Sequence, residues 1–341
     1  MIHILLFVMY LLNTHVTYKV DGNPSILKED LELERKLELI NKPPIKSIHT
    51  KIGHIVDCID ILKQPSFDHP LLKSHKLQRK PNFQNVTRET SQKTLGTRPI
   101  FGLGKDECPM GTVPILRTTK EDLIREKSLL NDHILVHDLP GVHIAEVSLK
   151  PNYGPYYGVG GTNSIFNPRV DTKLQISMSH LWVQNGPIES TNKISLGWHV
   201  IPQLYGDYAT HYYTSWTDHV TKNWWISIEN KFIGYFPAKL FSNMSSADQV
   251  GWGGRTRTHP GTQSPQMGSG HFPHDDNPRH ACYFKLVSIQ DNERKTHGAK
   301  VYETHSFTDN PMCYDVRYYG DQGPHFGYLL MFGGPGGNCG N

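Results

Sequence analysis

The sequence predicts a mainly β protein, an antiparallel sandwich or barrel behind a small α/β N-terminal segment. The 341 residues include 30 Gly and 23 Pro, and only 20% are charged, which argues against coiled coils and helical repeats. The 16 Tyr, 13 Phe and 6 Trp suit strands better than helices. After Leu139, apolar residues recur at every second position between Gly, Pro and Asn turns, which is typical of antiparallel sheets.

Charge and hydropathy exclude several classes of protein. The formal net charge is +3 and no Lys/Arg run is sustained, so nothing indicates a nucleic-acid partner. The mean hydropathy of −0.48 excludes a multi-span membrane protein. The 20 His side chains titrate near neutrality, so the net charge would rise steeply in an acidic compartment.

The N-terminus resembles a secretory leader. The apolar run at residues 4–12 has the length of a signal-peptide core and is too short to span a bilayer. We expect a signal peptide over residues 1–22, cleaved between Thr17 and Gly22; the alternative is a buried N-terminal strand. The mature protein is then secreted, with the acidic apoplast or vacuole as destinations, and is not held in a membrane.

Glycosylation sequons and cysteines agree with export. Asn85 and Asn243 each begin an N-x-S/T sequon and are the expected glycosylation sites. None of the five cysteines lies in a C-x-x-C motif, so neither a zinc site nor a thioredoxin-like motif is indicated. In an exported chain they predict disulfides with one thiol left over. The cysteines are Cys58, Cys108, Cys282, Cys313 and Cys339.

The first third of the chain is predicted to hold separate short elements. A charged helix is expected over residues 27–42, because Pro43 and Pro44 end its helical spacing, and a strand-like stretch (HIVDCIDIL) follows. Residues 81–105 are polar and contain Gly and Pro, as linkers do. Thr118 and Glu121 are expected to form a capping box before a second short helix.

Strands are predicted wherever apolar and polar residues alternate beyond the second helix. We expect strands around three such runs, separated by turn residues. The alternating apolar residues are Leu174, Ile176 and Met178; Trp224, Ile226 and Ile228; and Phe326, Tyr328, Leu330 and Phe332.

Familiar catalytic and cofactor motifs are missing. The sequence has neither an H-E-x-x-H zinc motif nor a G-x-S-x-G nucleophile elbow, and residues 102–105 lack the rest of a phosphate loop. His271, His274 and His280 have metal-ligand chemistry, but the prolines among them favour a solvated loop. We therefore expect no metal and no cofactor. The tryptophans could stack on sugars or proline rings, although core packing is the commoner role.

Nine stretches of the chain, taken in order, resemble one known family. They are residues 41–81 and 107–123, then YYGVGGTNSIFNPRV (156–170), SHLWVQNG (179–186), LGWHVIPQLYGD (196–207), NWW (223–225), IGYFPAKLF (233–241), QMGSGHF (266–272) and FGGPGG (332–337). Together they identify the chain as a member of the neprosin family, with residues 23–80 resembling its activation peptide and residues 106–341 its catalytic domain.

This resemblance implies a two-sheet β-sandwich behind a removable N-terminal segment. It also implies a glutamic endopeptidase that works in acid and cleaves after proline, so that the expected partner is a proline-containing peptide or protein. The family's catalytic pair is two glutamates, one in a segment written I-E-A-G-W and the other in V-E-W-G-G-E. Such a pair needs one protonated carboxyl and one ionised carboxylate in a single cleft.

The chain departs from the family at both glutamates. Ser195 stands at the first position, and Gly251 and Arg255 stand at the acidic positions of the second segment. At acid pH a serine hydroxyl is no general base, and arginine cannot lose its proton. We therefore expect a catalytically inactive neprosin-domain protein. The alternatives are an acid prolyl endopeptidase that uses other carboxylates and a sandwich that binds cell-wall glycans. The nearby carboxylates are Glu189, Asp218, Glu229 and Asp248.

The resemblance also implies a shortened domain and two disulfides. Between Thr217 and Asn223 the family has an additional segment of about 45 residues, about four strands with their turns, which this chain lacks. Removing inner strands exposes sheet edges. Cys313 and Cys339 match the family's late disulfide. Cys58 and Cys108, on either side of the linker, form the second expected pair, and Cys282 is left as a buried thiol.

Overall fold

The computed structural model describes residues 5–6, 25–50, 53–79, 107–129, 140–187, 191–216, 223–228, 231–275 and 277–340. Most of the expected signal peptide, the expected linker with its sequon at Asn85, and the carboxylates Glu189, Asp218 and Glu229 lie outside these residues. The described chain is mainly β, as predicted. None of its helices is long and apolar enough to cross a membrane.

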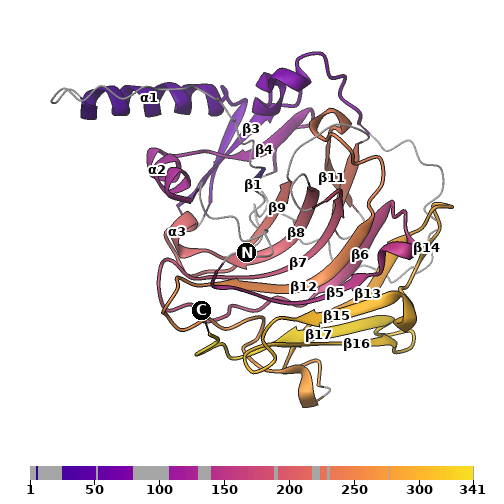
Figure 1. The fold of residues 1–341 in the computed structure, drawn as a ribbon. Helices are drawn as coiled ribbons and strands as arrows, with labels where there is room; N and C mark the ends of the chain where they lie inside the picture. Colours follow the sequence, from indigo (N-terminus) through magenta and orange to yellow (C-terminus); the bar gives the residue numbers. More distant parts are fainter. Residues whose placement is uncertain are drawn as a thin grey trace.

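Two large sheets form the body of the protein (Figure 1). The first has seven strands in the order β1-β9-β8-β7-β12-β5-β15. Every pair in it is antiparallel except β1 with β9. Its strands are β1 (Leu5–Leu6), β5 (Val142–Leu149), β7 (Ile176–Asn185), β8 (Asn192–Val200), β9 (His211–Trp216), β12 (Gln249–Arg257) and β15 (Thr304–Thr308).

The second sheet packs against one face of the first. It has the order β14-β13-β17-β16, with β6 also paired to β13. Its strands are β6 (Gly158–Asn163), β13 (Cys282–Gln290), β14 (Thr296–His297), β16 (Asp315–Asp321) and β17 (Tyr328–Gly333). The two sheets confirm the expected two-sheet β-sandwich.

One continuous hydrophobic core lies between the two sheets. Alternate residues of a strand face opposite sides, so each strand of the first sheet gives one side chain in two to this core. The first sheet contributes Ala145, Val147, Leu149, Ile194, Trp198, Val250 and Trp252, and the second contributes Phe284, Val287, Ile289, Leu330 and Phe332. The intervening residues of β5, β7, β8 and β12 point to the other face of the seven-stranded sheet, where the N-terminal module lies (Figure 1).

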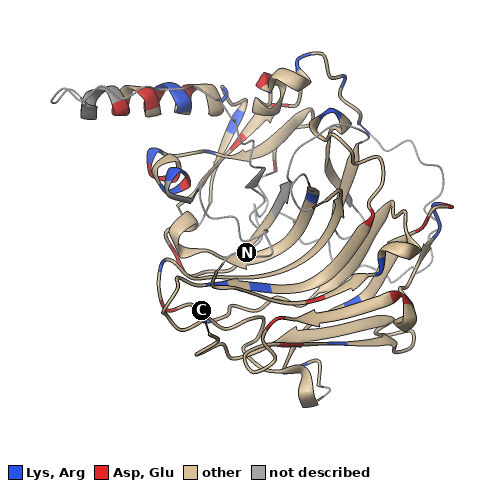
Figure 2. Cartoon of the chain, in the orientation of Figure 1, with Lys and Arg blue, Asp and Glu red and all other residues tan. Residues whose placement is uncertain are grey.

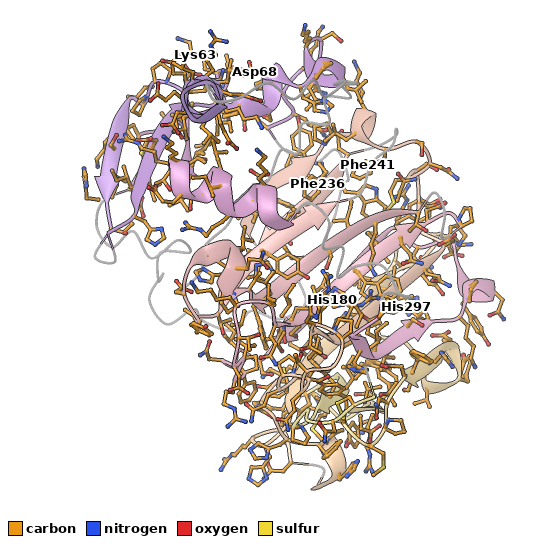
Figure 3. All side chains as sticks on the ribbon, turned by 60° about the vertical axis from the view of Figure 1, so that its left-hand side comes forward. Lys63, Asp68, His180, Phe236, Phe241 and His297 are labelled. Atoms are coloured by element: carbon orange, nitrogen blue, oxygen red, sulfur yellow. A yellow bond between two sulfur atoms is a disulfide. The ribbon has the colours of Figure 1, made fainter. Side chains whose placement is uncertain are left out.

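The N-terminal module is a small α/β unit. Helix α1 (Ser25–Ile40) precedes β2 (Lys46–His49) and β3 (Ile55–Asp60), and two 3₁₀ turns follow, η1 (Pro65–Asp68) and η2 (Pro70–Leu72). Figure 2 shows that charged residues are frequent along α1 and sparse along the strands of the large sheets. Leu72, at the end of η2, is buried in the same cluster as Phe236 and Phe241 of the sandwich. Figure 3 shows these two phenylalanines on the side of the body nearest the module.

One strand that follows the expected linker pairs with the N-terminal module. β4 (Thr112–Leu116) follows the expected linker, yet it pairs along its whole length with β3 and completes the three-stranded sheet β2-β3-β4. The N-terminal module therefore contains strands from both sides of the linker. Hydropathy could not show which sheet β4 joins, because a short strand has the same apolar pattern in either sheet.

The capping box expected at Thr118 and Glu121 is wrong by one residue: the second helix, α2 (Lys120–Leu129), has Thr119 as its cap. Thr119 and Asp122 form the reciprocal cap: the Asp122 backbone N–H donates to Thr119 Oγ1 and the Thr119 N–H donates to Asp122 Oδ2. Asp122 therefore has the capping role that was expected for Glu121. Arg125 of α2 donates to the carbonyl of Leu204 in α3 (Pro202–Tyr205), which ties the module to the sandwich.

The β10–β11 hairpin stands apart from the two sheets. β10 (Trp224–Ile228) pairs only with β11 (Lys231–Phe236) among the described strands. The preceding strand, β9, ends at Trp216, next to the expected deletion, and its outer edge pairs only with the two residues of β1 in the described chain.

Both expected disulfides are formed. Cys58 bonds to Cys108, and Cys313 bonds to Cys339. Cys282 is free and buried, and burial raises the pKa of its thiol to about 12, so it is inert as a nucleophile near neutral pH. Asn243 of the second sequon is exposed beside the fully buried Met244.

Candidate functional site

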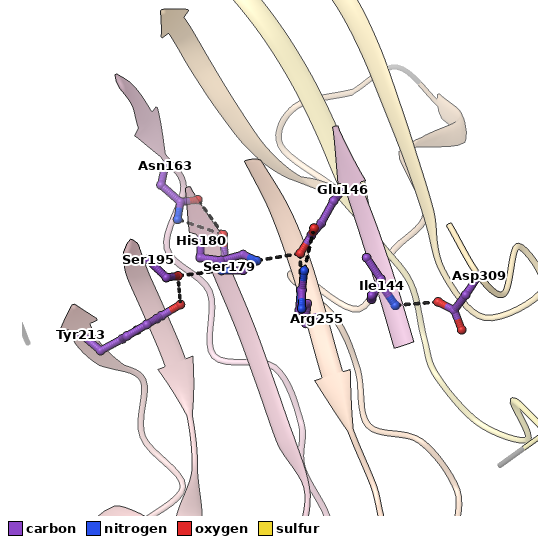
Figure 4. A network of polar contacts seen from close by, with 9 residues as sticks. All are labelled: Ile144, Glu146, Asn163, Ser179, His180, Ser195, Tyr213, Arg255 and Asp309. Carbon is purple, nitrogen blue, oxygen red and sulfur yellow. Dashed lines mark hydrogen bonds and ion pairs between the residues drawn. The ribbon is translucent and has the colours of Figure 1, made fainter. Parts of the chain in front are cut away.

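Five polar side chains meet on the face of the seven-stranded sheet that points away from the core. They are Glu146 of β5, Arg255 of β12, His180 of β7, Ser195 of β8 and Tyr213 of β9. Figure 4 shows them bonded in one line across the sheet.

Glycines in the intervening strands make these contacts possible. Gly253 lies between Glu146 and His180 in the strand register, and Gly197 lies between His180 and Tyr213. A Cβ at Gly253 would come within 2.3 Å of a backbone oxygen, and one at Gly197 within 2.0 Å. With no side chain at these two places, the longer side chains on either side can reach each other.

Arg255 and Glu146 form a buried ion pair. The guanidinium donates from Nε to Oε1 and from Nη2 to Oε2, the second bond measuring 3.0 Å. Arg255 is only 2% exposed and Glu146 only 5% exposed. Burial alone would raise the pKa of Glu146, but Arg255 and His180 hold it well below its usual value, so the carboxylate stays ionised.

His180 continues the chain from Glu146 to Ser195. Its Nε2 lies 2.7 Å from Glu146 Oε1 and its Nδ1 lies 2.8 Å from Ser195 Oγ, which in turn lies 2.9 Å from the Tyr213 hydroxyl. An ionised carboxylate only accepts, so His180 donates from Nε2 and its Nδ1 accepts from Ser195. Burial lowers the pKa of His180 to about 4, and the cations Arg255 and Lys193 act in the same direction against Glu146.

A tryptophan and a lysine lie beside Ser195. Trp182 is the direct cross-strand partner of both Ser195 and Gly251, and Lys193 Nζ lies 4.4 Å from the centroid of its ring. Within the described part of the chain, Trp182 Nε1 is a buried donor without a hydrogen-bond partner. Burial lowers the pKa of Lys193 to about 7, and Arg255 adds to the effect while Glu146 opposes it.

Gly251 cannot hold the family's glutamate in this arrangement. A Cβ there would lie 2.6 Å from Trp182 Cζ2 and 2.7 Å from the carbonyl oxygen of Val147. The indole of Trp182 therefore occupies the space that a side chain at residue 251 would need.

The structure brings together two of the positions singled out in the sequence. Ser195 and Arg255 belong to one network, joined through His180 and Glu146. Asp248 lies just outside β12 and accepts from the Gly186 N–H. Seven residues separate it from Arg255 along an extended chain, a distance of about 20 Å.

The remaining candidates do not assemble into a site. Among the residues that the structure describes, no group of three or more His, Cys, Asp or Glu side chains could hold a metal ion. His274 instead lies 3.1 Å from one carboxylate oxygen of Asp315. Trp182 and Trp198 are buried, as the commoner role of tryptophan suggested, whereas Trp224 and Trp225 are only partly buried.

Sequence reasoning missed Glu146 and His180. Neither belongs to a motif, because their contact depends on the register of three strands. One signal was available: Glu146 stands among the apolar residues Ile144, Ala145 and Val147, and a carboxylate that is buried with them needs a cationic or hydrogen-bonding partner. Arg255, at a position where the family has an acid, was the cation to pair with it.

Together, the fold and the network define a β-sandwich that carries a buried polar network on one sheet face and an N-terminal module with a disulfide across the expected linker. Two family models match the chain, Neprosin over residues 173–222 and 216–335, and Neprosin activation peptide over residues 47–133. These matches cover most of the described chain, and the chain belongs to the neprosin family. The Neprosin match is split into two pieces that meet at residues 216–222.

Proposed function

We propose that this neprosin-domain protein is secreted and does not carry out the family's acid cleavage after proline. The observation that carries the proposal is the buried ion pair between Arg255 and Glu146. A glutamic peptidase needs a carboxyl that is protonated at working pH and a second that is ionised. Here, one of the family's acidic positions holds a guanidinium bonded to a carboxylate from another strand.

The carboxylate present cannot take over the missing role. Glu146 has a pKa held well below its usual value, so it is not protonated at the pH where a general acid would act. Both of its oxygens accept from Arg255, and Oε1 also accepts from His180. The alternative, an acid peptidase based on Asp248, would have to work about 20 Å from Arg255, along a strand with 3.3 Å per residue.

Secretion and a binding role complete the proposal. Two disulfides suit an oxidising compartment, and Asn243 is exposed for glycan attachment. The protein would bind proline-containing peptides without cutting them. A role in binding cell-wall glycans would have to use Trp224 and Trp225, which are partly buried, because Trp182 and Trp198 are buried and cannot stack on sugars in this form.

The test is digestion of a library of proline-containing peptides at acid pH, read by mass spectrometry. The full chain with intact disulfides is compared with an active neprosin-family peptidase and with the Asp248→Asn variant. We expect no cuts after proline from this chain. Cuts that persist in a Ser195→Ala variant would overturn the proposal, and their loss in Asp248→Asn would identify the substitute acid.

Binding is measured separately with the same library immobilised on beads. We expect the full chain to retain proline-containing peptides over matched sequences in which alanine replaces proline. Equal retention of both sets would remove the peptide-binding part of the proposal. Retention on cell-wall polysaccharide instead would favour the glycan alternative.

A further inference from the structure

The network contains the parts of a different reaction. Ser195 Oγ, His180 and Glu146 form a continuous Ser–His–Glu chain with contacts of 2.8 and 2.7 Å. The same order of nucleophile, base and orienting carboxylate recurs on unrelated hydrolase folds. We propose that Ser195 is the nucleophile of a serine-type acyl-transfer site whose substrates are carboxylic esters.

The direction of every proton in the chain follows from Glu146. Because its carboxylate is ionised, His180 carries its proton on Nε2 and presents a bare Nδ1 to the Ser195 hydroxyl. The Ser195 proton is then directed to Nδ1, and Tyr213 donates to Ser195 Oγ. This is the resting state of a serine nucleophile with its general base. In the familiar triad Nε2 faces the serine and Nδ1 faces the carboxylate, whereas here Nδ1 faces Ser195 and Nε2 faces Glu146.

Arg255 has a definite part in this chain. It keeps Glu146 ionised, which fixes the tautomer of His180. The charged and titratable groups that face His180 are Glu146 of β5, Arg255 of β12, Lys193 of β8 and, through Ser195, Tyr213 of β9. Burial, Arg255 and Lys193 together outweigh Glu146 and lower the pKa of His180 to about 4, so above that pH the imidazole is neutral and its Nδ1 lone pair can accept a proton.

The strand next to Ser195 carries a buried N–H donor, on an indole whose Cε2 and Cζ2 atoms lie against Gly251 of β12. Trp182 is the cross-strand partner of Ser195, is 4% exposed, and its Nε1–H has no partner within the described chain. A buried, unsatisfied donor costs free energy unless something accepts from it, and a tetrahedral oxyanion is such an acceptor. Lys193 Nζ lies 4.4 Å from the centre of the same indole and adds a positive charge on that side below its pKa of about 7.

The reaction balances with these groups alone. Ser195 Oγ adds to the ester carbonyl carbon while its proton passes to His180 Nδ1. The bond to the leaving alcohol breaks, and the alcohol takes that proton, which leaves an acyl-serine. Water then attacks the acyl carbon, gives one proton to His180, and releases the carboxylic acid as the proton returns to Ser195 Oγ.

The test uses the full chain and a small probe, because Ser195 is fully buried. Diisopropyl fluorophosphate forms a P–O bond to a serine nucleophile and releases fluoride, and peptide mapping by mass spectrometry locates the adduct. We expect an adduct on Ser195 and none on Ser148, which lies on the same sheet face, is more exposed and has no imidazole bonded to it. Ser148→Ala is the matched control variant.

Hydrolysis of p-nitrophenyl acetate gives the second readout. Ser195→Ala should abolish the protein-dependent rate, whereas Ser148→Ala should leave it unchanged. His180→Gln should lower the rate by about 10²–10⁴-fold. Trp182→Phe keeps the ring, loses the N–H, and should lower the rate by about 10²-fold.

The results separate this inference from the proposed function. Labelling of the wild-type chain does not depend on whether a variant folds. If prolonged treatment with diisopropyl fluorophosphate labels a reference serine hydrolase but gives no adduct on Ser195, the inference is overturned. Labelling of Ser148 at an equal rate also overturns it. In either case the absence of acid cleavage after proline would still stand, and cuts after proline that survive Ser195→Ala would overturn the proposed function alone.

Discussion

Arg255 of β12 reaches diagonally across the sheet to Glu146 of β5, and its guanidinium donates to both oxygens of that carboxylate. The direct cross-strand partner of Arg255 is Ile144, and the partner of Glu146 is Gly253, so the contact depends on the missing side chain at residue 253. The consequence is chemical. The place of a catalytic acid is held by a fixed cation, and the carboxylate beside it is fixed in its ionised form.

Acid should destabilise the fold through its buried histidines. Burial lowers the pKa of His180 to about 4 and that of His199 to about 3, against about 6.5 in an unfolded chain. The unfolded state therefore binds more protons, and stability falls as the pH drops from 6.5 towards 4. His180→Gln should flatten this dependence, measured by urea unfolding between pH 7 and 4. An unchanged slope would show that His180 is not buried as a neutral group.

Residue 251 should reject any side chain. Gly251→Ala places a methyl group against Trp182 and the Val147 carbonyl, so we expect a loss of about 1–3 kcal/mol from overpacking. Gly234→Ala is the control, because nothing lies within 4 Å of a Cβ there. Thermal unfolding of both variants measures the difference. Equal stability would mean that Trp182 moves aside easily, and that a glutamate could be restored at this position.

Leu72 should anchor the N-terminal module to the sandwich. It is 3% exposed and packs in the core cluster with Phe236 and Phe241, whereas its neighbour Leu71 is 42% exposed. We expect Leu72→Ala to lower the free energy of unfolding by about 2–5 kcal/mol and Leu71→Ala to change it by less than about 0.5 kcal/mol. Hydrogen exchange in residues 55–60 would show whether the module loosens first. Similar losses for both variants would contradict the anchoring role.

Cutting the expected linker should not release the N-terminal module. A protease site placed between residues 80 and 106 yields a fragment with β2 and β3, while β4 and Cys108 stay with the sandwich. The Cys58–Cys108 disulfide still joins the two pieces. On denaturing gels they should migrate together without reductant and separate with it. A Cys58→Ser/Cys108→Ser variant is the control and should separate in both cases; separation of the cut wild type without reductant would rule out the bond.

Local patterns in the sequence predicted the elements well. The helix expected at 27–42 is α1 (Ser25–Ile40), and the alternating runs fall on β7, β10 and β17, apart from their first or flanking residues such as the exposed Leu174. The cap of α2 was misplaced by one residue because threonine occurs twice in succession and both are followed three residues later by an acid. Local chemistry alone does not choose between them.

What sequence could not predict depends on register. Glu146, His180 and Ser195 come from three strands, 34 and 15 residues apart in sequence, and meet only because glycines lie between them. The position of β4 has the same origin, since pairing with β3 is a long-range choice. Ser195 and Arg255 were recognised through the family resemblance, but what replaced the acid pair was visible only once the strands were aligned.

The most direct measurement of the central claim is a double-mutant cycle on the ion pair. Arg255→Met leaves a buried carboxylate without its cation and should cost about 3–5 kcal/mol. Glu146→Gln/Arg255→Met should cost much less than the sum of the two single variants, with a coupling free energy above about 1.5 kcal/mol. Such coupling would establish that Arg255, at the family's acidic position, forms an ion pair with Glu146 that stabilises the fold. If the two single losses add to within about 0.5 kcal/mol, Arg255 and Glu146 are not coupled, and the central claim is contradicted.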